Sequence, residues 1–319
     1  MDKSINIDRI CGAFRSVMIR ALYHHRVALI LFAIVVVGWG ITWVVTKTIV
    51  GHVPPFWTTA IRSVIASVGL LGLLLVRGQF IIPKRGDVAV VVVAGLFHMV
   101  AFSTLITIGL KYVPVGRSIV LGYTTPLWVA PGAWLFLHEG MPRMRLAGIA
   151  LGLVGLLVMF NPLTFDWGDR PALIGNGLLL LSALAWSVSI LYVRAHTWIS
   201  SPFQLIFWQA LLASCILLLL ALTFEGRPHI EWTSGLIAGF AYTGLVGTAL
   251  AYWAMNEVNR RLPATTTSLG ILATPVVGIV SSAFFLGETI DRPMIIATTL
   301  ILGGIAIGTI RRRAAAALA

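Results

Sequence analysis

The sequence predicts an all-α integral membrane protein in which ten transmembrane helices form two inverted five-helix repeats. Three observations support this prediction: the composition, ten long apolar runs and an internal duplication. Of the 319 residues, 58% are hydrophobic and only 11% are charged, whereas a soluble domain has about 45–50% apolar and about 25% charged residues. With a mean hydropathy of +0.95, the chain has too few polar side chains to cover a surface that faces water. A lipid bilayer is therefore the expected solvent, and apolar helices of about 20 residues are the expected elements.

Ten apolar runs follow one another along the chain, and each is long enough to cross a bilayer. Residues that favour turns separate them, among them Gly51–Pro55, Pro83, Pro142, the polar segment 161–171 and Asp291–Pro293. We expect one transmembrane helix from each run, and no connection is long enough to form a soluble domain. The runs lie at 27–49, 56–77, 88–110, 114–136, 143–161, 172–194, 202–224, 234–256, 264–286 and 293–310.

The duplication appears as one spacing of prolines, glycines and acids that occurs twice. Pro114, Pro126 and Glu139 recur 149 residues later as Pro263, Pro275 and Glu288, and Gly95 and Gly155 recur as Gly244 and Gly304. A second set recurs after 147 residues: Trp39 as Trp186, Lys47 as Arg194, and Pro55-Phe56 as Pro202-Phe203. A self-match at a fixed distance indicates a repeated unit, and a small loop insertion explains the two-residue difference. Because five helices per copy is an odd number, the second copy must enter the membrane upside down, as in secondary transporters whose substrate site lies near the midplane between the halves.

The distribution of Lys and Arg predicts the orientation, because cytoplasmic loops carry an excess of both. With the N-terminus inside, 16 of the 23 Lys and Arg residues fall on the inner side, so both termini are expected to be cytoplasmic. Residues 1–26 form a basic tail with apolar residues at helical spacing, which suits a helix on an anionic leaflet; the alternative is a basic tail that only sets the topology. The expected units are this tail, a first repeat at 27–161, a second repeat at 172–310 and a cytoplasmic tail at 311–319.

Several function classes lack support in the sequence. The net charge of +12 does not indicate a nucleic-acid partner, because the positive residues lie between apolar runs as they do in cytoplasmic loops. Cys11 and Cys215 are too few for a disulfide framework or a four-ligand zinc site. No Asp or Glu lies in the middle of an apolar run, and the chain has neither a phosphate-binding G-x-x-x-x-G-K-[ST] loop nor an H-E-x-x-H motif. We therefore expect a protein that is not an enzyme and that needs no cofactor or metal.

Three motifs carry a resemblance to a known family. They are Gly38-Trp39-Gly40 in the first run, Arg62-x-x-x-Ala66 in the second, and the two prolines followed by Leu137-x-Glu139 that close the fourth. With ten helices in two halves, the chain resembles the drug/metabolite transporter superfamily, specifically its EamA-type members; the second half has Gln209 in place of Arg62. The resemblance implies a multi-pass exporter of the bacterial inner membrane with a central cavity lined by both halves. The aromatic-rich helices resemble bacterial exporters of aromatic and other amino acids.

The candidate substrate-binding residues are polar or aromatic side chains deep within the runs. Trp39 and Trp43 share one helix face, and Trp186 is the repeat equivalent of Trp39. The alternatives for such tryptophans are core packing and the interfacial belt, and the belt is preferred for Trp57, Trp167, Trp198 and Trp232. The full candidate set is Trp39, Trp43, His98, Phe102, Tyr123, Thr125, Pro126, Trp186, Ser268 and Pro275.

Two prolines near the middle of their runs add a backbone feature. Pro126 and Pro275 each lack a backbone donor and are expected to kink or break their helices. The carbonyl groups four residues earlier, those of Gly122 and Ile271, would be freed and could accept hydrogen bonds from a substrate ammonium if they line a watery cavity. The alternative is a purely structural kink.

The ionisable residues within the runs have two interpretations each. His98 either has a transport role, in which it couples protons or binds a substrate carboxylate, or it is a structural histidine that is hydrogen-bonded to a neighbour's backbone. Arg62 either pairs with a substrate carboxylate or has a structural role, and the structural role is preferred because the second helix of this family is expected to be peripheral. Glu139 and Glu288 lie beside turns, where we expect them to cap or pin the next helix.

The sequence therefore favours a secondary transporter that exports small amphipathic metabolites, with aromatic or other apolar amino acids as expected substrates, by alternating access. The alternative within the superfamily is a nucleotide-sugar, sugar-phosphate or drug transporter. A lipid-modifying enzyme or a passive pore is a third interpretation, for which no nucleophile and base are evident. The expected partners are a small-molecule substrate and the lipid bilayer. The small-residue pairs Gly148/Gly152 and Gly304/Gly308 permit close helix packing, within the chain or in a homodimer.

Overall fold

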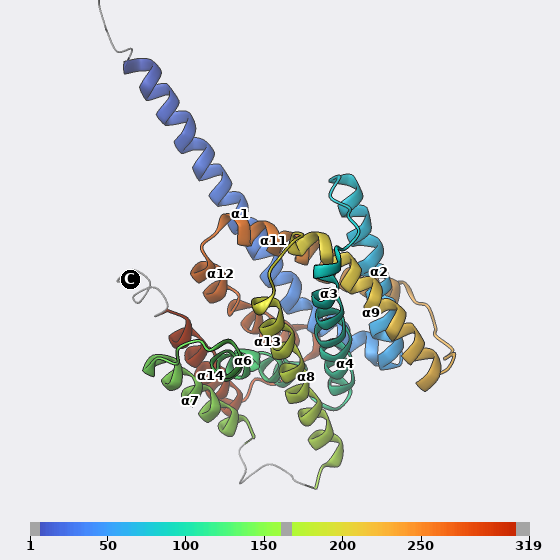
Figure 1. Cartoon of the computed structure of the whole chain (residues 1–319). Coiled ribbons are helices and arrows are strands. Elements are labelled where there is room, and N and C mark those ends of the chain that lie inside the picture. Colours follow the sequence, from blue (N-terminus) through green and yellow to red (C-terminus); the bar gives the residue numbers. More distant parts are fainter. Residues whose placement is uncertain (1–6, 161–167, 311–319) are drawn as a thin grey trace, which may run out of the picture.

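The computed structural model describes residues 7–160 and 168–310, with side chains from Arg26 onward except at positions 264, 265, 268 and 310. Every regular element in these ranges is helical (Figure 1). In chain order they are α1 (Ile7–Val50), α2 (Pro55–Val76), η1 (Arg85–Asp87), α3 (Val88–Ala94), η2 (Gly95–Phe102), α4 (Ser103–Tyr112), α5 (Val115–Gly122), α6 (Thr125–Leu137), α7 (Arg143–Phe160), α8 (Arg170–Ala195), α9 (Pro202–Phe224), α10 (Ser234–Ala241), η3 (Tyr242–Leu250), α11 (Ala251–Arg261), α12 (Ala264–Gly270), α13 (Ala273–Leu286) and α14 (Arg292–Ile310).

The helices follow the predicted apolar runs, and two runs are interrupted, between α5 and α6 and between α12 and α13. Nine helices in the described ranges are long and apolar enough to cross a membrane. The run at 264–286 is split into α12 and α13, and α13 alone is shorter than a full span. The count of ten membrane crossings and the cytoplasmic placement of the termini stay predictions. Helix α1 continues from the basic tail into the first span without a break, and the attachment of that tail to a leaflet is also a prediction.

Local signals place the starts of several helices. Ser201 accepts a hydrogen bond from the backbone of Gln204, and the Gln204 side chain accepts one from the Ser201 backbone, so a complete capping box begins α9. The carboxylate of Asp169 caps α8 by accepting a bond from Ala172 N. Pro55 occupies the first turn of α2, where its missing N–H has no intrahelical partner to lose.

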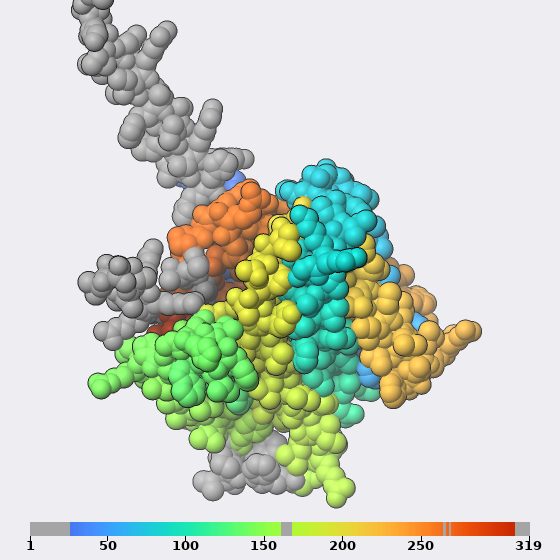
Figure 2. Space-filling model, viewed as in Figure 1, coloured from blue at the N-terminus to red at the C-terminus, as the bar shows by residue number. Residues whose placement is uncertain are grey.

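The outer surface of the helix bundle exposes large apolar side chains, as expected for contact with lipid. Val76 is 89% exposed, Phe284 is 81% exposed and Phe136 is 70% exposed. Apolar surface of this extent would cause aggregation in water, whereas lipid tails solvate it. Figure 2 shows α3 and α4 packed between α8 and α9 on one face of the bundle.

Equivalent helices of the two repeats cross each other in pairs. In α2 and α9, the hydroxyl groups of Ser67 and Ser214 lie 3.1 Å apart, and these residues are equivalent in the 147-residue repeat. One turn away, Ser63 donates to the carbonyl oxygen of its own equivalent, Ala210, at 3.2 Å. Contacts between equivalent residues are what a two-fold axis requires, so a pseudo-two-fold axis passes between α2 and α9.

The equivalent helices α7 and α14 also pack against each other, at closer range. A Cβ atom on Gly148 would overlap the carbonyl oxygen of Gly304, and a Cβ on Gly304 would overlap that of Gly148. The helices lie side by side at one end of the bundle, away from α2 and α9 (Figure 1). These two glycines therefore serve packing within the chain, so they offer no support for a homodimer, which stays a prediction.

Two further glycine contacts, one from each repeat, are equivalent to each other. A Cβ on Gly95 would lie 3.4 Å from the carbonyl oxygen of Gln209, and a Cβ on the equivalent Gly244 would lie 3.2 Å from that of Arg62. Gly95 opens η2 and Gly244 lies in η3, and these two segments are the π-helices among residues 7–160 and 168–310. Each π segment is thus packed against the second helix of the opposite repeat, α2 or α9.

Glu288 connects the repeats rather than neighbouring helices. Its carboxylate accepts hydrogen bonds from the backbone N–H groups of Val115 (2.6 Å) and Gly116 (3.0 Å) at the start of α5. The expectation that Glu288 would pin the next helix is therefore wrong, because the chain folds its turn against the other repeat. The equivalent Glu139 pairs with Arg194 and Arg145.

Candidate functional site

A cavity lies in the middle of the bundle, between residues of both repeats. Its volume is about 150 Å³. Helices α1, α2, α4, α8 and α11, both π segments and the break between α5 and α6 contribute to its wall. The residues that line it are Trp39, Thr42, Trp43, Thr46, Arg62, His98, Met99, Phe102, Ser103, Ile106, Leu110, Tyr123, Trp186, Gly247, Thr248 and Tyr252.

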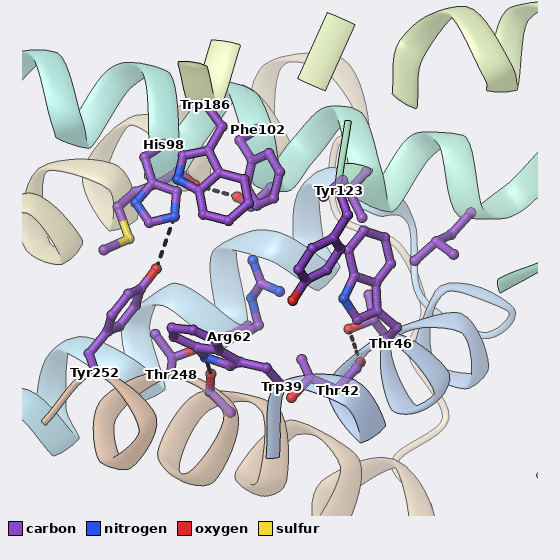
Figure 3. A pocket seen from close by; sticks show the side chains of 16 residues that line it. Trp39, Thr42, Thr46, Arg62, His98, Phe102, Tyr123, Trp186, Thr248 and Tyr252 are labelled. Atoms are coloured by element: carbon purple, nitrogen blue, oxygen red, sulfur yellow. Dashed lines mark hydrogen bonds between the residues drawn. The ribbon is translucent and has the colours of Figure 1, made fainter. Parts of the chain in front are cut away.

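One wall of the cavity is a stack of rings on η2 and α8. The His98 and Trp186 rings are nearly parallel, with centroids 5.5 Å apart and an interplanar angle of 7°. Phe102, one turn beyond His98, places its ring 4.7 Å from Trp186. Figure 3 shows these three rings side by side along the cavity. A flat apolar ring of a substrate would find π faces on this wall.

Tyr252 and Trp39 form the facing wall. Their rings meet edge to face at 5.9 Å. The Tyr252 hydroxyl hydrogen-bonds His98 Nε2 at 3.1 Å, which joins the two walls across the cavity (Figure 3). His98 is therefore satisfied by a side chain of the other repeat rather than by a neighbour's backbone. Trp39 Nε1 donates to the carbonyl oxygen of Gly247 at 3.1 Å.

The π segments explain how these side chains reach the cavity. Residues Gly95–Phe102 and Tyr242–Leu250 occupy equivalent places in the two repeats. A π segment widens the helix by about one residue per turn and redirects the side chains that follow, and such segments are frequent at functional sites. His98 lies within the first segment, and Tyr252 follows the second. The Gly247 carbonyl within the second segment accepts the Trp39 bond described above.

A second cavity lies beyond the ring stack. Thr125, Pro126, Arg145 and Arg194 contribute to its lining, and the two arginines belong to the predicted cytoplasmic side. Its wall also includes three residues that line the first cavity, so an aromatic partition stands between the two spaces. The shared residues are Trp39, Tyr123 and Trp186.

The structure distributes the predicted site residues among four places. Trp39, Trp43, His98, Phe102, Tyr123 and Trp186 line the first cavity. Thr125 and Pro126 line the second. Pro275 is buried in α13 and lines neither cavity. The side chain of Ser268 lies outside the described residues.

The prolines break their helices as expected, but the carbonyl groups they free are not vacant. The chain is interrupted between α5 and α6 and between α12 and α13. Thr125 Oγ1 donates to the Gly122 carbonyl at 2.8 Å, and the Thr274 backbone N–H donates to the Ile271 carbonyl at 3.0 Å. Residues beside each break thus replace one lost bond at each carbonyl, and binding of a substrate ammonium by these carbonyls stays a prediction.

Arg62, Thr42, Thr46 and Tyr252 line the cavity but were absent from the candidate set. A stripe at helical spacing, Trp39, Thr42 and Thr46, was available in the sequence as a signal for the two threonines. Arg62 was assigned to a peripheral helix, and α2 does lie at the edge of the bundle beside α9 (Figure 1). The inner face of α2 nevertheless reaches the cavity, where Arg62 contributes to the wall.

An all-helical bundle with duplicated halves, a lipid-facing surface and a cavity between the halves defines the class of membrane transporters. The sequence profile of the EamA-like transporter family matches residues 26–161 and again residues 173–310. The chain belongs to the EamA-like transporter family, and it is a multi-pass protein of the bacterial inner membrane.

Individual relatives agree with this family. The uncharacterized transporter YoaV of Bacillus subtilis is 25% identical over 275 residues, which cover 85% of this chain and 92% of that protein. A probable amino-acid metabolite efflux pump of Salmonella typhimurium is 29% identical over 288 residues, covering 86% of this chain and 92% of that protein. A solved crystal structure that is 21% identical matches with a TM-score of 0.64, over 89% of this chain and 98% of that chain, which shows the same fold.

Proposed function

We propose that this transporter exports small amphipathic metabolites, with aromatic or other apolar amino acids as its substrates, by alternating access around the first cavity. The observation that carries the proposal is the ring stack of His98, Trp186 and Phe102, set against Trp39 and Tyr252 between the two repeats. Similarity to a probable amino-acid metabolite efflux pump supports the same substrate class. Weak ring contacts, about 0.5–1.5 kcal/mol per pair beyond burial, suit a carrier that must release its cargo.

Nucleotide sugars and sugar phosphates are the alternative substrates. A diphosphate needs several cations, because each phosphate oxygen must be paired when it leaves water. Arg62 is the one Lys or Arg among the described residues that line the first cavity. This single cation favours a substrate with one anionic group over a phosphorylated sugar.

The experiment that tests the proposal is uptake of labelled tryptophan into proteoliposomes, with and without unlabelled tryptophan inside. We expect saturable uptake that preloading accelerates, because a carrier returns faster when it is loaded. Uptake that neither saturates nor responds to preloading would indicate a pore instead. No tryptophan flux in correctly folded protein would remove aromatic amino acids as substrates.

Replacing Trp186 by alanine is expected to lower the initial rate of tryptophan exchange about tenfold or more. The change removes both ring contacts that Trp186 makes, with His98 and with Phe102, and each tenfold corresponds to about 1.4 kcal/mol. The matched control is Trp134→Ala, since Trp134 is 55% exposed on the outer surface of α6. Exchange at the wild-type rate in a folded Trp186→Ala protein would refute the role of this ring.

A further inference from the structure

Arg62 presents a charge to the cavity without a partner in the part of the chain that the structure describes. It projects from α2 into the space between Trp39 and Tyr123 (Figure 3). Among the described residues, its guanidinium forms neither a hydrogen bond nor an ion pair. Ionisable residues at membrane depth are costly, face cavities and mark binding functions. An unpaired guanidinium at membrane depth is therefore the feature of this cavity that most strongly indicates a binding function.

The carboxylates that could neutralise Arg62 are engaged elsewhere. Glu288 and Glu225 accept backbone hydrogen bonds at the starts of α5 and α2. Glu257 pairs with Arg77 and Arg261, Glu139 pairs with Arg194, and Asp87 bonds His196. No Asp or Glu lines the first cavity within the described residues. The cavity thus keeps one permanent positive charge and offers no negative one.

This charge pattern has a consequence for the ligand. A carboxylate would face the planar guanidinium, which can donate two parallel hydrogen bonds to it. A ligand ammonium would meet no carboxylate, and it would be repelled by Arg62 across a low-dielectric space. Aromatic faces can attract an ammonium, but this attraction would have to overcome its repulsion by Arg62.

We propose that Arg62 is the carboxylate-recognition residue of the cavity, and that the preferred ligands are aromatic monocarboxylates, with those that lack an ammonium group bound at least as tightly as the amino acids. The ring stack of His98, Trp186 and Phe102 holds the aromatic part, and Arg62 holds the anionic end. This inference rests on the proposed function, because it takes the same cavity as the transport site.

The second repeat supplies the natural substitution for a test. Gln209 is the equivalent of Arg62 in α9, and it is buried at the matching contact with Gly95. Glutamine is therefore compatible with this helix position and its packing, and Arg62→Gln removes the charge with little change of shape. Arg62→Lys keeps the charge but loses the two-pronged donor. Arg227→Gln, in the exposed loop after α9, is the matched control.

The experiment is direct binding by isothermal titration calorimetry to the full chain in lipid nanodiscs, with three indole probes. Indole-3-propionate has only the carboxylate, tryptophan has both charged groups, and tryptamine has only the ammonium. For wild-type protein and Arg227→Gln, we expect indole-3-propionate to bind at least as tightly as tryptophan, and tryptamine to show no saturable binding. Arg62→Gln should weaken indole-3-propionate about ten- to a hundredfold, since hydrogen bonds to charged groups are the strong ones; Arg62→Lys should fall between.

The outcomes separate this inference from the function on which it rests. Tryptamine binding as tightly as indole-3-propionate, or unchanged indole-3-propionate affinity in folded Arg62→Gln and Arg62→Lys, would overturn the role of Arg62, while tryptophan exchange in proteoliposomes would still support the proposed function. If none of the three probes binds the wild-type protein and no tryptophan is exchanged, both the proposed function and the inference fail.

Discussion

Replacing Gly304 by valine is expected to abolish the correctly folded protein. A side chain at this position must occupy the space of the Gly148 carbonyl oxygen, and its Cβ would also lie 2.9 Å from Gly152 N. Both obstacles are backbone atoms, so no rotamer change relieves them, and α7 and α14 must separate along their contact. Overpacking costs about 1–3 kcal/mol where side chains can adjust, and more where they cannot, against a typical total stability of about 5–15 kcal/mol. The measurement is the yield and thermal unfolding midpoint of monodisperse protein by fluorescence-detected size-exclusion chromatography.

The neighbouring residue provides the control. A Cβ on Gly303 has no atom within 4 Å, so Gly303→Val carries the same helix-propensity change without the overlap. It should leave the unfolding midpoint close to that of the wild type. Equal behaviour of the two variants would show that the Gly148–Gly304 approach does not hold the repeats together.

Replacing Glu288 by alanine is expected to lower stability by about 2–4 kcal/mol. The carboxylate accepts two backbone hydrogen bonds at the start of α5, where the helix dipole also favours a negative charge. Hydrogen bonds to a charged group make a net contribution of about 1.5–3 kcal/mol each, and water that reaches the freed N–H groups offsets part of the loss. The loss should appear as a lower unfolding midpoint in nanodiscs, measured at constant lipid composition.

Two further variants test whether the loss in Glu288→Ala comes from the two backbone hydrogen bonds. Glu288→Gln keeps one acceptor oxygen and should give an intermediate loss. Glu231→Ala removes an exposed carboxylate in the loop before α10 and should change the midpoint little. An unfolding midpoint of Glu288→Ala equal to that of Glu231→Ala would show that the link between the repeats is energetically unimportant.

The division of the chain into apolar helices was predictable, but two features of those helices were not. The split between α12 and α13 follows from Pro275, a local signal that the sequence displays. The π segments at Gly95–Phe102 and Tyr242–Leu250 have no such signal, because an all-apolar stretch has the same hydrophobicity pattern in either helix type. Only the close contacts of Gly95 and Gly244 with the opposite repeat reveal why the helices widen there.

The aromatic residues of the candidate site were predictable from the sequence, whereas the charged residue Arg62 was not included in the predicted site. Trp39 and Trp186 were found because the repeat makes them equivalent, and His98 because an ionisable residue within an apolar run is conspicuous. Arg62 was equally conspicuous, but its direction depends on how α2 is rotated against α9. That rotation is set by the contacts of Ser63 and Ser67 with the other repeat, which lie 147 residues away in sequence.

The sequence by itself determined the solvent, the helices and the duplication, because composition and spacing act locally: a run of apolar residues needs lipid wherever it lies, and a repeated motif is visible without a fold. Only the tertiary structure decided which side chains meet. Glu288 clamps the other repeat, the freed proline carbonyls are already bonded, and Arg62 enters the cavity unpaired. These outcomes depend on the rotation and crossing of helices, which are set by packing between residues far apart in the chain.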